Sequence, residues 1–460
     1  MIDGLFHRFP SFQKAGAAAY KPGLDHMVFF DQMAGHPHRK YRTIHIAGTN
    51  GKGSVSSMLA SVCASAGLKT GLYTSPHILD FRERMRIVEK TDRSDGSTGY
   101  SCSCISREEV WDFVNKWSET FDHLDLSFFE ITTMMAFSWF ASRNVDMAVI
   151  ETGLGGRLDS TNIIVPELSV ITNIGLDHCD ILGNTLPEIA FEKSGIIKPA
   201  VPVVVGESDP STDPVFERKV LYTNLQDSEF NGDRNRIMSL LTFADKVNPP
   251  LWEDRNSILE CMDLKGEYQR KNLRTVLAAV DVLARQGTVS VGESEVEGAI
   301  VHTASRTNFH GRWEKFSDAP YVICDIGHNP HGLRYNFSQL EEMMQSGRFD
   351  RLTIVYGAMA DKDVNEVLRY VPGCARLIFT TAPGRRAMPA EDIMSRYIET
   401  GGDPARAVCR DSIKSALEEA GVLSGPRKDA GEKRHLVYIG GSTYVVAETV
   451  PLLRPADDPC

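Results

Sequence analysis

The segment Gly48 to Ser54 is the part of the chain whose residue types and spacing most directly predict chemistry. It reads G-T-N-G-K-G-S and stands between an apolar run ending at Ala47 and a helix-like stretch. Glycines let the backbone turn tightly and direct its N–H groups inward, and the positive amino end of the next helix attracts an anion. Lys52 can reach terminal phosphates, and the Ser54 hydroxyl can bind Mg²⁺. The segment therefore predicts a nucleotide phosphate site formed by Gly48, Thr49, Asn50, Gly51, Lys52, Gly53 and Ser54.

The same segment departs from the general P-loop pattern at two positions. Ile46 stands where that pattern has its first glycine, and Gly53 separates the lysine from the hydroxyl. A generic NTPase assignment is therefore premature. The structural alternative is a glycine-rich turn that merely joins a strand to a helix. The order of strand, loop, lysine, hydroxyl and helix favours the phosphate site.

Two further candidates follow apolar runs that have the composition of strands. Glu151 closes one run and precedes a glycine-rich turn, where a carboxylate can hold Mg²⁺ beside phosphates. His178 follows the next run, so both side chains are expected at adjacent strand ends. Taken alone, each could be an ordinary structural residue, but their shared placement favours a metal site. Lys193, two residues before Gly195 at the end of a predicted helix, has by position no role beyond complementing the helix dipole.

Arg312 and Asp325 are the candidates in the second half of the chain. Asp325 ends an apolar run and begins D-I-G-H-N-P, and Arg312 follows Gly311. An arginine and an aspartate from a second domain could close over a bound nucleotide, stabilising charge and excluding water. The alternative is that both are turn or cap residues. The pattern Y-Q-R-K-N at 268–272 is uninformative by itself.

The elements that must position these residues alternate along the chain. Apolar, β-branched runs recur between helical stretches, which predicts parallel sheets covered on both faces. The predicted fold class is α/β, with a P-loop-type amino-terminal ATPase domain on a mostly parallel sheet and a smaller Rossmann-like carboxyl-terminal domain. A boundary near Ala304 to Asn308 gives domains 1–305 and 306–460. The expected strands are 43–47, 147–151, 168–173 and 201–205 in the first domain, and 321–325, 352–356, 377–380 and 436–439 in the second.

Two polar stretches interrupt this alternation. Residues 89–104, rich in Ser, Asp and Gly, are predicted to form a surface loop. Residues 207–260, with weak periodicity and many charges, are predicted to form a peripheral extension of the first domain.

Length and composition limit the possible functions. A chain of 460 residues exceeds one ordinary core, and its 42% hydrophobic and 24% charged residues are typical of a globular protein. The net charge of −11 argues against nucleic-acid or anionic-membrane binding. The nine scattered cysteines include no C-x-x-C pair, so reduced thiols in a cytoplasmic protein are expected. The amino terminus has no apolar stretch of signal-peptide length, and the run Ile131 to Phe140 is about half a membrane span.

Taken together, these motifs resemble those of the folylpolyglutamate synthase/dihydrofolate synthase family in the Mur ligase superfamily. The resemblance implies an ATP-dependent ligase, in which a pterin-linked carboxylate attacks the γ-phosphate and L-glutamate captures the acyl phosphate. The matching pieces span nearly the whole chain: G-T-N-G-K-G-S at 48–54, T-S-P-H at 74–77, R-E-R-M-R-I at 82–87, F-F-E at 128–130, E-T-G-L-G-G-R-L-D-S-T-N at 151–162, L-D-H at 176–178, E-K-S-G-I-I-K at 192–198, Y-Q-R-K-N at 268–272, G-R-W-E at 311–314, D-I-G-H-N-P at 325–330, D-K-D at 361–363 and G-S-T-Y at 441–444.

The resemblance also implies roles for individual residues. The catalytic residues would be Lys52, His178 and Lys193, the last carbamylated by CO₂. Two Mg²⁺ ions would be held by Ser54, Ser75, Glu151 and His178. The phosphate loop would be joined in ATP binding by Asn272, Arg312, Asp325 and His328. The dihydropteroate would contact Phe129, Glu130, Leu158, Asp159 and Ser160.

The form G-G-R-L-D at 155–159 resembles the bifunctional members, which implies glutamate addition to both 7,8-dihydropteroate and tetrahydrofolate. Two departures from the family pattern, Ser194 in place of the commoner alanine and the insertion at 89–104, remove no predicted ligand. The expected partners are ATP, L-glutamate, dihydropteroate and reduced folates, without nucleic acid or membrane, and the expected state is a monomer.

Three alternatives remain open. The first is folylpolyglutamate synthase activity alone. The second is a Mur-type ligase that joins amino acids to UDP-muramyl peptides, which should lack T-S-P-H and F-F-E as they stand here. The third is a nucleotide-binding switch protein, which predicts no glutamate dependence and leaves the second-domain motifs unexplained.

Overall fold

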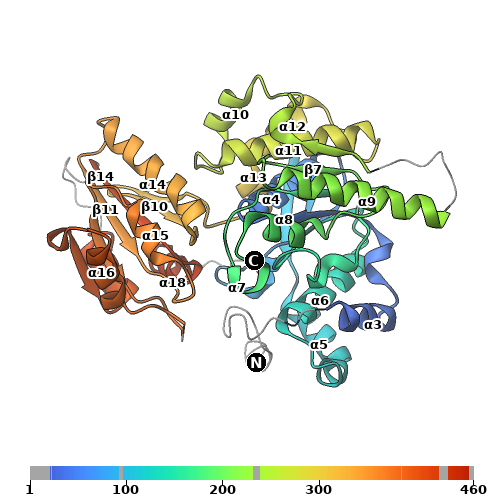
Figure 1. Ribbon diagram of the computed structural model, residues 1–460, viewed down its shortest axis with the longest axis horizontal. Helices are drawn as coiled ribbons and strands as arrows, with labels where there is room; N and C mark the ends of the chain where they lie inside the picture. Colours follow the sequence, from blue (N-terminus) through green and yellow to red (C-terminus); the bar gives the residue numbers. More distant parts are fainter. Residues whose placement is uncertain are drawn as a thin grey trace. The chain divides into compact units, whose positions relative to one another are not determined.

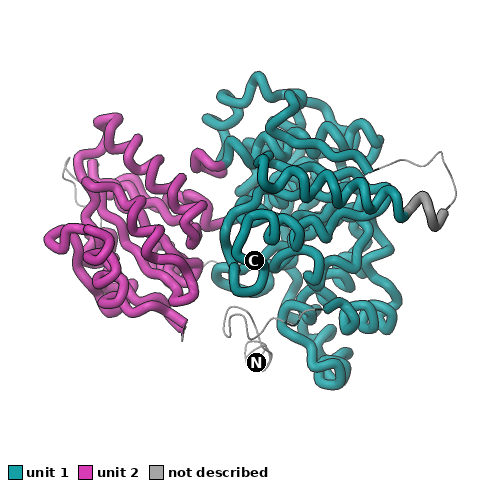
Figure 2. Tube along the Cα trace, in the orientation of Figure 1, with its two compact units in different colours: residues 1–263, 269–309, 460 teal, residues 264–268, 310–459 magenta. Residues whose placement is uncertain are grey.

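The computed structural model describes residues 21, 23–92, 97–231, 239–384, 386–423 and 434–454. Figure 1 shows its helices and strands, and Figure 2 shows that the chain divides into two compact units. Unit 1 comprises Met1–Asp263 and Gln269–Phe309, and unit 2 comprises Leu264–Tyr268 and His310–Pro459. Each unit is built on one sheet with helices around it, so the predicted α/β class is confirmed.

The sheet of unit 1 has eight strands in the order β4-β3-β2-β5-β1-β6-β7-β8. Pairing is parallel from β2 to β8, whereas β3 is antiparallel to both of its neighbours. Strands β5 and β6 are buried along their whole length, as expected for parallel strands covered on both faces. The strands are β1 (Arg42–Ala47), β2 (Thr70–Tyr73), β3 (Met85–Asp92), β4 (Thr98–Cys104), β5 (Met147–Glu151), β6 (Leu168–Ile171), β7 (Val203–Val205) and β8 (Leu241–Phe243).

Helices cover both faces of this sheet (Figure 1). On one face, α3 (Asp25–Met33), α5 (Arg107–His123) and α6 (Phe128–Ser142) enclose an apolar cluster with β2, β3 and β5. A neighbouring cluster joins α8 (Leu186–Ser194) and α9 (Asp213–Asn231) to β6 and β7. Helix α4 (Lys52–Ser65) contacts β1, β2 and β5, and it also contacts α11 (Gln269–Arg285), α12 (Glu293–Val301) and α13 (Thr303–Thr307). The buried sheet therefore holds the loop between β1 and α4 on a rigid base.

The prediction of a surface loop at 89–104 is wrong. Strands β3 and β4 form an antiparallel hairpin at the edge of the sheet, while residues 93–96 lie outside the described residues. Tyr100 anchors β4, because its hydroxyl lies 3.1 Å from Ser65 Oγ and the Arg306 guanidinium stacks 3.7 Å above its ring. The Ser- and Gly-rich composition masks this pairing in the sequence.

The stretch 207–260 contains regular structure, of which β8 extends the main sheet. It forms α9, β8 and α10 (Arg255–Cys261), and β8 pairs in parallel with β7. Residues 232–238 lie outside the described residues. The stretch belongs to unit 1, and β8 is the outermost strand of the sheet, so the extension is peripheral as predicted but is built of regular structure.

Unit 2 has a six-stranded sheet in the order β13-β12-β11-β14-β10-β9, parallel except for β9. Its four predicted strands are all present, and the sheet is smaller than that of unit 1. The strands are β9 (Glu314–Asp318), β10 (Tyr321–Asp325), β11 (Arg351–Tyr356), β12 (Arg376–Thr380), β13 (Ala407–Arg410) and β14 (His435–Gly440). The helices are α14 (Pro330–Gln345), α15 (Val364–Arg369), α16 (Ala390–Glu399), α17 (Ile413–Glu419) and α18 (Thr443–Leu453).

Two sequence expectations concern thiols and membranes. Among the cysteines that the structure describes, seven are free thiols and Cys104 is disulfide-bonded, so the expectation of reduced thiols is wrong at that position. The run Ile131 to Phe140 lies within α6 and packs in the core of unit 1. Within the described part of the chain, every helix is too short or too polar to cross a bilayer.

Candidate functional site

The phosphate loop needs glycine at two positions where other parts of the chain approach it closely. Gly48 follows β1 with φ +148°, and a Cβ there would lie 1.8 Å from Thr172 Oγ1. Gly51 caps α4 with φ +80°, and a Cβ there would lie 2.2 Å from Asn272 Oδ1. Only glycine fits both the left-handed backbone and the space. Asn272, a predicted nucleotide residue, is thus brought against the loop.

The segment after β6 holds this loop in shape. Thr49 N donates to Asn173 O at 3.0 Å, and Asn50 N donates to Asn173 Oδ1 at 2.9 Å. Thr172 Oγ1 donates to Asn50 O at 2.6 Å. We did not predict roles for Thr172 and Asn173, although both stand in the T-N-I-G-L-D-H segment that drew attention to His178.

Two lysines converge on the first residues of the loop. Lys52 Nζ donates to the carbonyls of Gly48 and Thr49, each at 3.1 Å. Lys193 Nζ donates to the same Gly48 carbonyl at 2.9 Å, although Lys193 comes from α8, which a Thr185 capping box begins. Sequence position alone did not predict this convergence.

Lys193 is in an unusual electrostatic environment. Lys193 is 4% exposed. Burial, together with the positive charge of Lys52, lowers the pKa of its amine from 10.5 to about 7, whereas the charges of Asp177 and Asp159 oppose this shift. A buried amine with this pKa is largely uncharged just above neutral pH. An uncharged amine can act as a nucleophile, whereas an ammonium group cannot.

The predicted metal ligands include a carboxylate that lies at the phosphate loop. Glu151 ends β5, is 2% exposed, and accepts a 3.3 Å hydrogen bond at Oε2 from Ser75 N. The same oxygen would lie 3.6 Å from a Cβ placed on Gly53, the residue before Ser54. The Ser54 hydroxyl accepts a hydrogen bond from Gln269 Nε2 at 3.3 Å. Ser54, Ser75 and Glu151 therefore lie in one neighbourhood.

His178 lies at the start of α7 (Cys179–Leu182) in a left-handed conformation, with its Nε2 3.8 Å from Asp177 Oδ1. Among the described residues, no group of three His, Cys, Asp or Glu side chains could hold a metal by itself. The predicted set contains only two such side chains. Its hydroxyl and carboxylate oxygens suit Mg²⁺, which commonly uses one or two carboxylates and completes its shell with waters and substrate phosphates.

Two buried arginines near Glu151 were not predicted as site residues. Arg84 Nε donates to His77 Nδ1 at 2.9 Å, and its guanidinium lies 5.2 Å from the Phe128 ring centroid. Arg86 donates to Thr74 Oγ1 at 2.7 Å. Burial lowers the pKa of both guanidinium groups, and Glu151 is among the charges that oppose this shift. Both arginines stand in the motif R-E-R-M-R-I at 82–87, but their residue types alone did not indicate a role.

The predicted pterin residues Phe129 and Glu130 lie at the start of α6. Phe129 covers the glycine-rich turn after β5, since a Cβ on Gly153 would lie 2.5 Å from its ring. Glu130 is 3% exposed, and its Oε2 accepts from Ser127 N at 2.8 Å and from Ser127 Oγ at 2.7 Å. This is a capping box, so the Glu130 carboxylate has a structural role at the helix start.

Asp159 is buried in the same neighbourhood, between half-buried Leu158 and Ser160. Its Oδ2 accepts from Leu154 N at 2.8 Å, and its Oδ1 accepts from Thr161 N at 3.0 Å. Burial raises the pKa of the Asp159 carboxyl, and its hydrogen bonds oppose this rise. The carboxylate thus ties together the two ends of the segment 153–161.

In unit 2, Asp325 organises three backbone segments at the end of β10. Its Oδ2 accepts from the Tyr268 hydroxyl and from Trp313 N, each at 2.8 Å, and its Oδ1 accepts from Gly327 N at 2.7 Å. Arg312 donates to Gly311 O at 3.3 Å, and His328 Nδ1 lies 3.1 Å from Ile326 O. The three predicted residues Arg312, Asp325 and His328 therefore lie on backbone segments that meet at this strand end.

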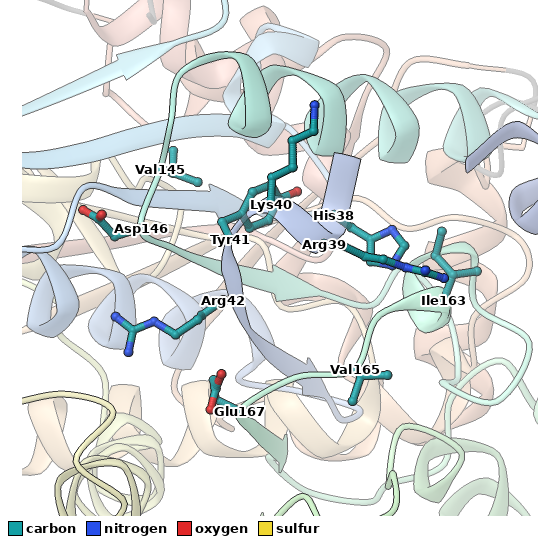
Figure 3. A pocket seen from close by; sticks show the side chains of 10 residues that line it. All are labelled: His38, Arg39, Lys40, Tyr41, Arg42, Val145, Asp146, Ile163, Val165 and Glu167. Atoms are coloured by element: carbon teal, nitrogen blue, oxygen red, sulfur yellow. The ribbon is translucent and has the colours of Figure 1, made fainter. Parts of the chain in front are cut away.

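A separate pocket of about 690 Å³ lies at the amino-terminal ends of strands in unit 1 (Figure 3). Its lining includes Arg39, Lys40, Arg42, Asp146 and Glu167. Arg42 begins β1, whereas the phosphate loop follows the other end of that strand. The pocket contains none of the predicted site residues and is distinct from the candidate site.

The chain resembles known proteins in both sequence and structure. Residues 311–430 match the family model described as "Mur ligase, glutamate ligase domain". The chain is 33% identical to the dihydrofolate synthase/folylpolyglutamate synthase of Bacillus subtilis (93% of this chain, 94% of that protein), and 31% identical to the folylpolyglutamate synthase of Lacticaseibacillus casei (96% and 95%). The structure is similar to Mycobacterium tuberculosis folylpolyglutamate synthase complexed with ADP, with a TM-score of 0.79 at 26% identity, covering 99% of this chain and 98% of that one.

Proposed function

The chain belongs to the dihydrofolate synthase/folylpolyglutamate synthase family, and from this premise we propose that it uses ATP to join L-glutamate to pterin-linked carboxylic acids. The observation that carries the proposal is the convergence of Lys52, Lys193 and the carboxylate of Glu151 on one glycine-dependent phosphate loop. An anion-binding loop supplied with cations and a metal-binding carboxylate suits phosphoryl transfer.

ATP binds at the loop 48–54, with its terminal phosphates reached by Lys52. Asn272, in contact with Gly51, lies where it can bind the nucleotide beside this loop. Arg312, Asp325 and His328 are proposed as further nucleotide-binding residues. The solved relative that contains ADP supports this assignment of the ligand.

The reaction has two steps. The substrate carboxylate attacks the γ-phosphorus of ATP, forming an acyl phosphate while the bond to the departing ADP breaks. The amine of L-glutamate then attacks the acyl carbon, forming the amide while inorganic phosphate leaves and a proton is lost. Lys52 stabilises the charge of the transferring group.

The metal set proposed for this chain is Ser54, Ser75, Glu151 and His178, holding two Mg²⁺ ions. When bound, these ions neutralise phosphate charge and orient the in-line displacement. The proximity of Glu151 to Ser75 and to the first turn of α4 supports the set. The buried guanidinium groups of Arg84 and Arg86 add positive charge near Glu151.

Lys193 is proposed to carry a carbamate formed with CO₂. Its burial and its pKa of about 7 support this proposal, because only the neutral amine reacts with CO₂. The product is a carboxylate on the end of the lysine, which converts a neutral amine into a negatively charged group next to Lys52.

Both 7,8-dihydropteroate and tetrahydrofolate are proposed as acceptors. The form G-G-R-L-D at 155–159 and the double name of the Bacillus subtilis relative support two activities. The pterin is assigned to the segment formed by Phe129, Glu130, Leu158, Asp159 and Ser160. The Lacticaseibacillus casei relative carries only the second name, so folylpolyglutamate synthesis alone is the alternative.

Four further assignments complete the proposal. Residues 1–305 bind ATP and the pterin, and residues 306–460 form the glutamate-ligase domain. The protein acts as a monomer in the cytoplasm.

Product analysis tests the proposal directly. Purified protein is incubated with Mg²⁺, ATP and ¹⁴C-labelled L-glutamate, with either 7,8-dihydropteroate or tetrahydrofolate as acceptor. We expect label in a pterin-containing product in both reactions. Label with tetrahydrofolate alone supports the single-activity alternative, and label with neither acceptor contradicts the proposal.

A further inference from the structure

A buried row of hydrogen-bonded side chains ends at Asp159 of the proposed pterin site, and its other two members, His45 and Thr161, have no part in the steps above. His45 Nε2 lies 2.8 Å from Thr161 Oγ1, and Thr161 Oγ1 lies 2.5 Å from Asp159 Oδ1. His45 and Thr161 are both 0% exposed, so neither side chain can contact a substrate. We propose that His45 and Thr161 are positioning residues that fix the segment 153–160, which contains the proposed pterin residues Leu158, Asp159 and Ser160, and that they act through the Asp159 carboxylate. This inference rests on the proposed function for the identity of the ligand.

The hydrogen bonds among His45, Thr161 and Asp159 have only one consistent direction. A carboxylate only accepts, so the Thr161 hydroxyl donates to Asp159 and its oxygen must accept from His45. The proton of the His45 ring therefore lies on Nε2. Burial and the nearby charge of Lys198 lower the pKa of His45 to about 3, so the ring is neutral and carries one proton. Its Nδ1 is buried without a hydrogen-bond partner among the described residues, as suits the unprotonated nitrogen.

The Asp159 carboxylate connects Thr161 to the glycine-rich turn of the segment 153–160. Its second oxygen accepts from Leu154 N at 2.8 Å, next to Gly153, whose surface is covered by the Phe129 ring. The first oxygen accepts from the Thr161 hydroxyl at 2.5 Å and from Thr161 N at 3.0 Å. Without the hydroxyl, only the longer backbone hydrogen bond would hold this oxygen, so the carboxylate could rotate and release Leu154. The turn that meets Phe129 would then lose its fixed shape.

His45 anchors these hydrogen bonds to a central strand of the sheet. It lies in β1, paired with Ile150 of β5 on one side and with Ser169 of β6 on the other. A site is positioned more precisely by a central strand than by a loop. The contacts that shape the phosphate loop use Thr172 and Asn173 instead, so loss of the His45 chain should weaken pterin binding and spare ATP binding.

Thr161→Val and Thr161→Ser form a matched pair for the test. Valine keeps the shape and the backbone hydrogen bond to Asp159 but removes both hydrogen bonds of the hydroxyl, to His45 and to Asp159. Serine keeps the hydroxyl. We expect Thr161→Val to raise KM for 7,8-dihydropteroate about ten- to a hundredfold, as for loss of a hydrogen bond to a charged group. KM for ATP and L-glutamate should stay within about twofold, as should all three constants in Thr161→Ser. An unchanged pterin KM in a folded Thr161→Val, or an equal rise in the ATP KM, would overturn the inference.

A second measurement needs neither turnover nor a stable Thr161→Val. ¹⁵N NMR of the histidine-labelled wild-type protein, with the His45 signal assigned by its loss in His45→Gln, should show a neutral ring protonated at Nε2. A proton on Nδ1, or a charged ring, would overturn the proposed chain. Absence of pterin-dependent turnover in the wild type would instead contradict the proposed function, so the two failures are distinguishable.

Discussion

Replacement of Lys193 by alanine tests the most unusual electrostatic feature of the site. With a pKa of about 7, about 90% of the Lys193 side chains are neutral at pH 8, compared with about 0.3% for a lysine of ordinary pKa. The buried environment therefore increases the reactive amine about 300-fold. We expect Lys193→Ala to lose nearly all ligation, because the proposed carbamate cannot form.

The assay is pterin-dependent ADP formation, measured with and without added formate or acetate. A short carboxylate that enters the space left by the lysine should restore part of the activity of Lys193→Ala. It should leave Lys52→Ala inactive, since that variant lacks a cation rather than a carboxylate. ¹³C NMR in ¹³C-bicarbonate should show a carbamate signal in the wild type that Lys193→Ala lacks.

The pH dependence gives the direction of the effect. Below pH 7 Lys193 is protonated and cannot react with CO₂, so wild-type ligation should fall as pH falls through about 7. In the carboxylate-rescued variant this decline should be absent. The folded-state pKa is also lower than the unfolded-state value, so the unfolded chain binds more protons between these two values. The stability of the CO₂-free wild type relative to Lys193→Met should therefore rise with pH from about 7 to about 10.5.

Two results would refute this reasoning. One is a wild-type enzyme that is fully active without CO₂ and gives no carbamate signal. The other is a Lys193→Ala variant whose turnover is close to that of the wild type.

Three further substitutions test other parts of the site. Glu151→Gln should lower turnover at least a hundredfold with an unchanged urea midpoint, because it removes a charge rather than packing, and near-wild-type turnover would contradict the metal assignment. Glu130→Ala should destabilise unit 1 by about 1 kcal/mol in urea unfolding through loss of the capping box. If capping is the whole role of Glu130, Glu130→Ala and Ser127→Ala should have the same KM for the pterin. Gly51→Ala should raise KM for ATP more than about tenfold, since its Cβ would meet Asn272. The control Gly67→Ala has a similar φ of +83° but nothing within 4 Å, so an equal effect on KM there would count against the contact.

Most of the sheet framework could be predicted because parallel strands buried on both faces are continuous apolar runs. Strands β1, β5 and β10 were recognised in this way, and the predicted ends at Glu151 and Asp325 are confirmed. The hairpin of β3 and β4 could not be recognised, since an edge strand such as Thr98–Cys104 alternates buried and exposed positions and is rich in small polar residues. Strand β8 (Leu241–Phe243) has only three residues, all of them half-buried, and therefore gave too weak a pattern.

The phosphate loop could be predicted because its chemistry is local in the sequence. The environment of Lys193 could not, since its low pKa arises from burial and from Lys52, which lies far away in the chain. Glu130 and Ser127 are close together in the sequence, but this spacing is as typical of a capping box as of a substrate site, and the structure contains the capping box. Buried partners such as Arg84 depend on tertiary packing, for which residue types give no signal.

The central claim is that this protein couples ATP cleavage to glutamate ligation on two pterin acceptors. Its most direct test is the rate of ADP formation with Mg²⁺ and L-glutamate, compared among 7,8-dihydropteroate, tetrahydrofolate and no pterin. We predict ADP formation with each pterin, dependent on L-glutamate, and only background without one. ADP formation that is independent of pterin and L-glutamate, or that is absent with both acceptors, would contradict the claim.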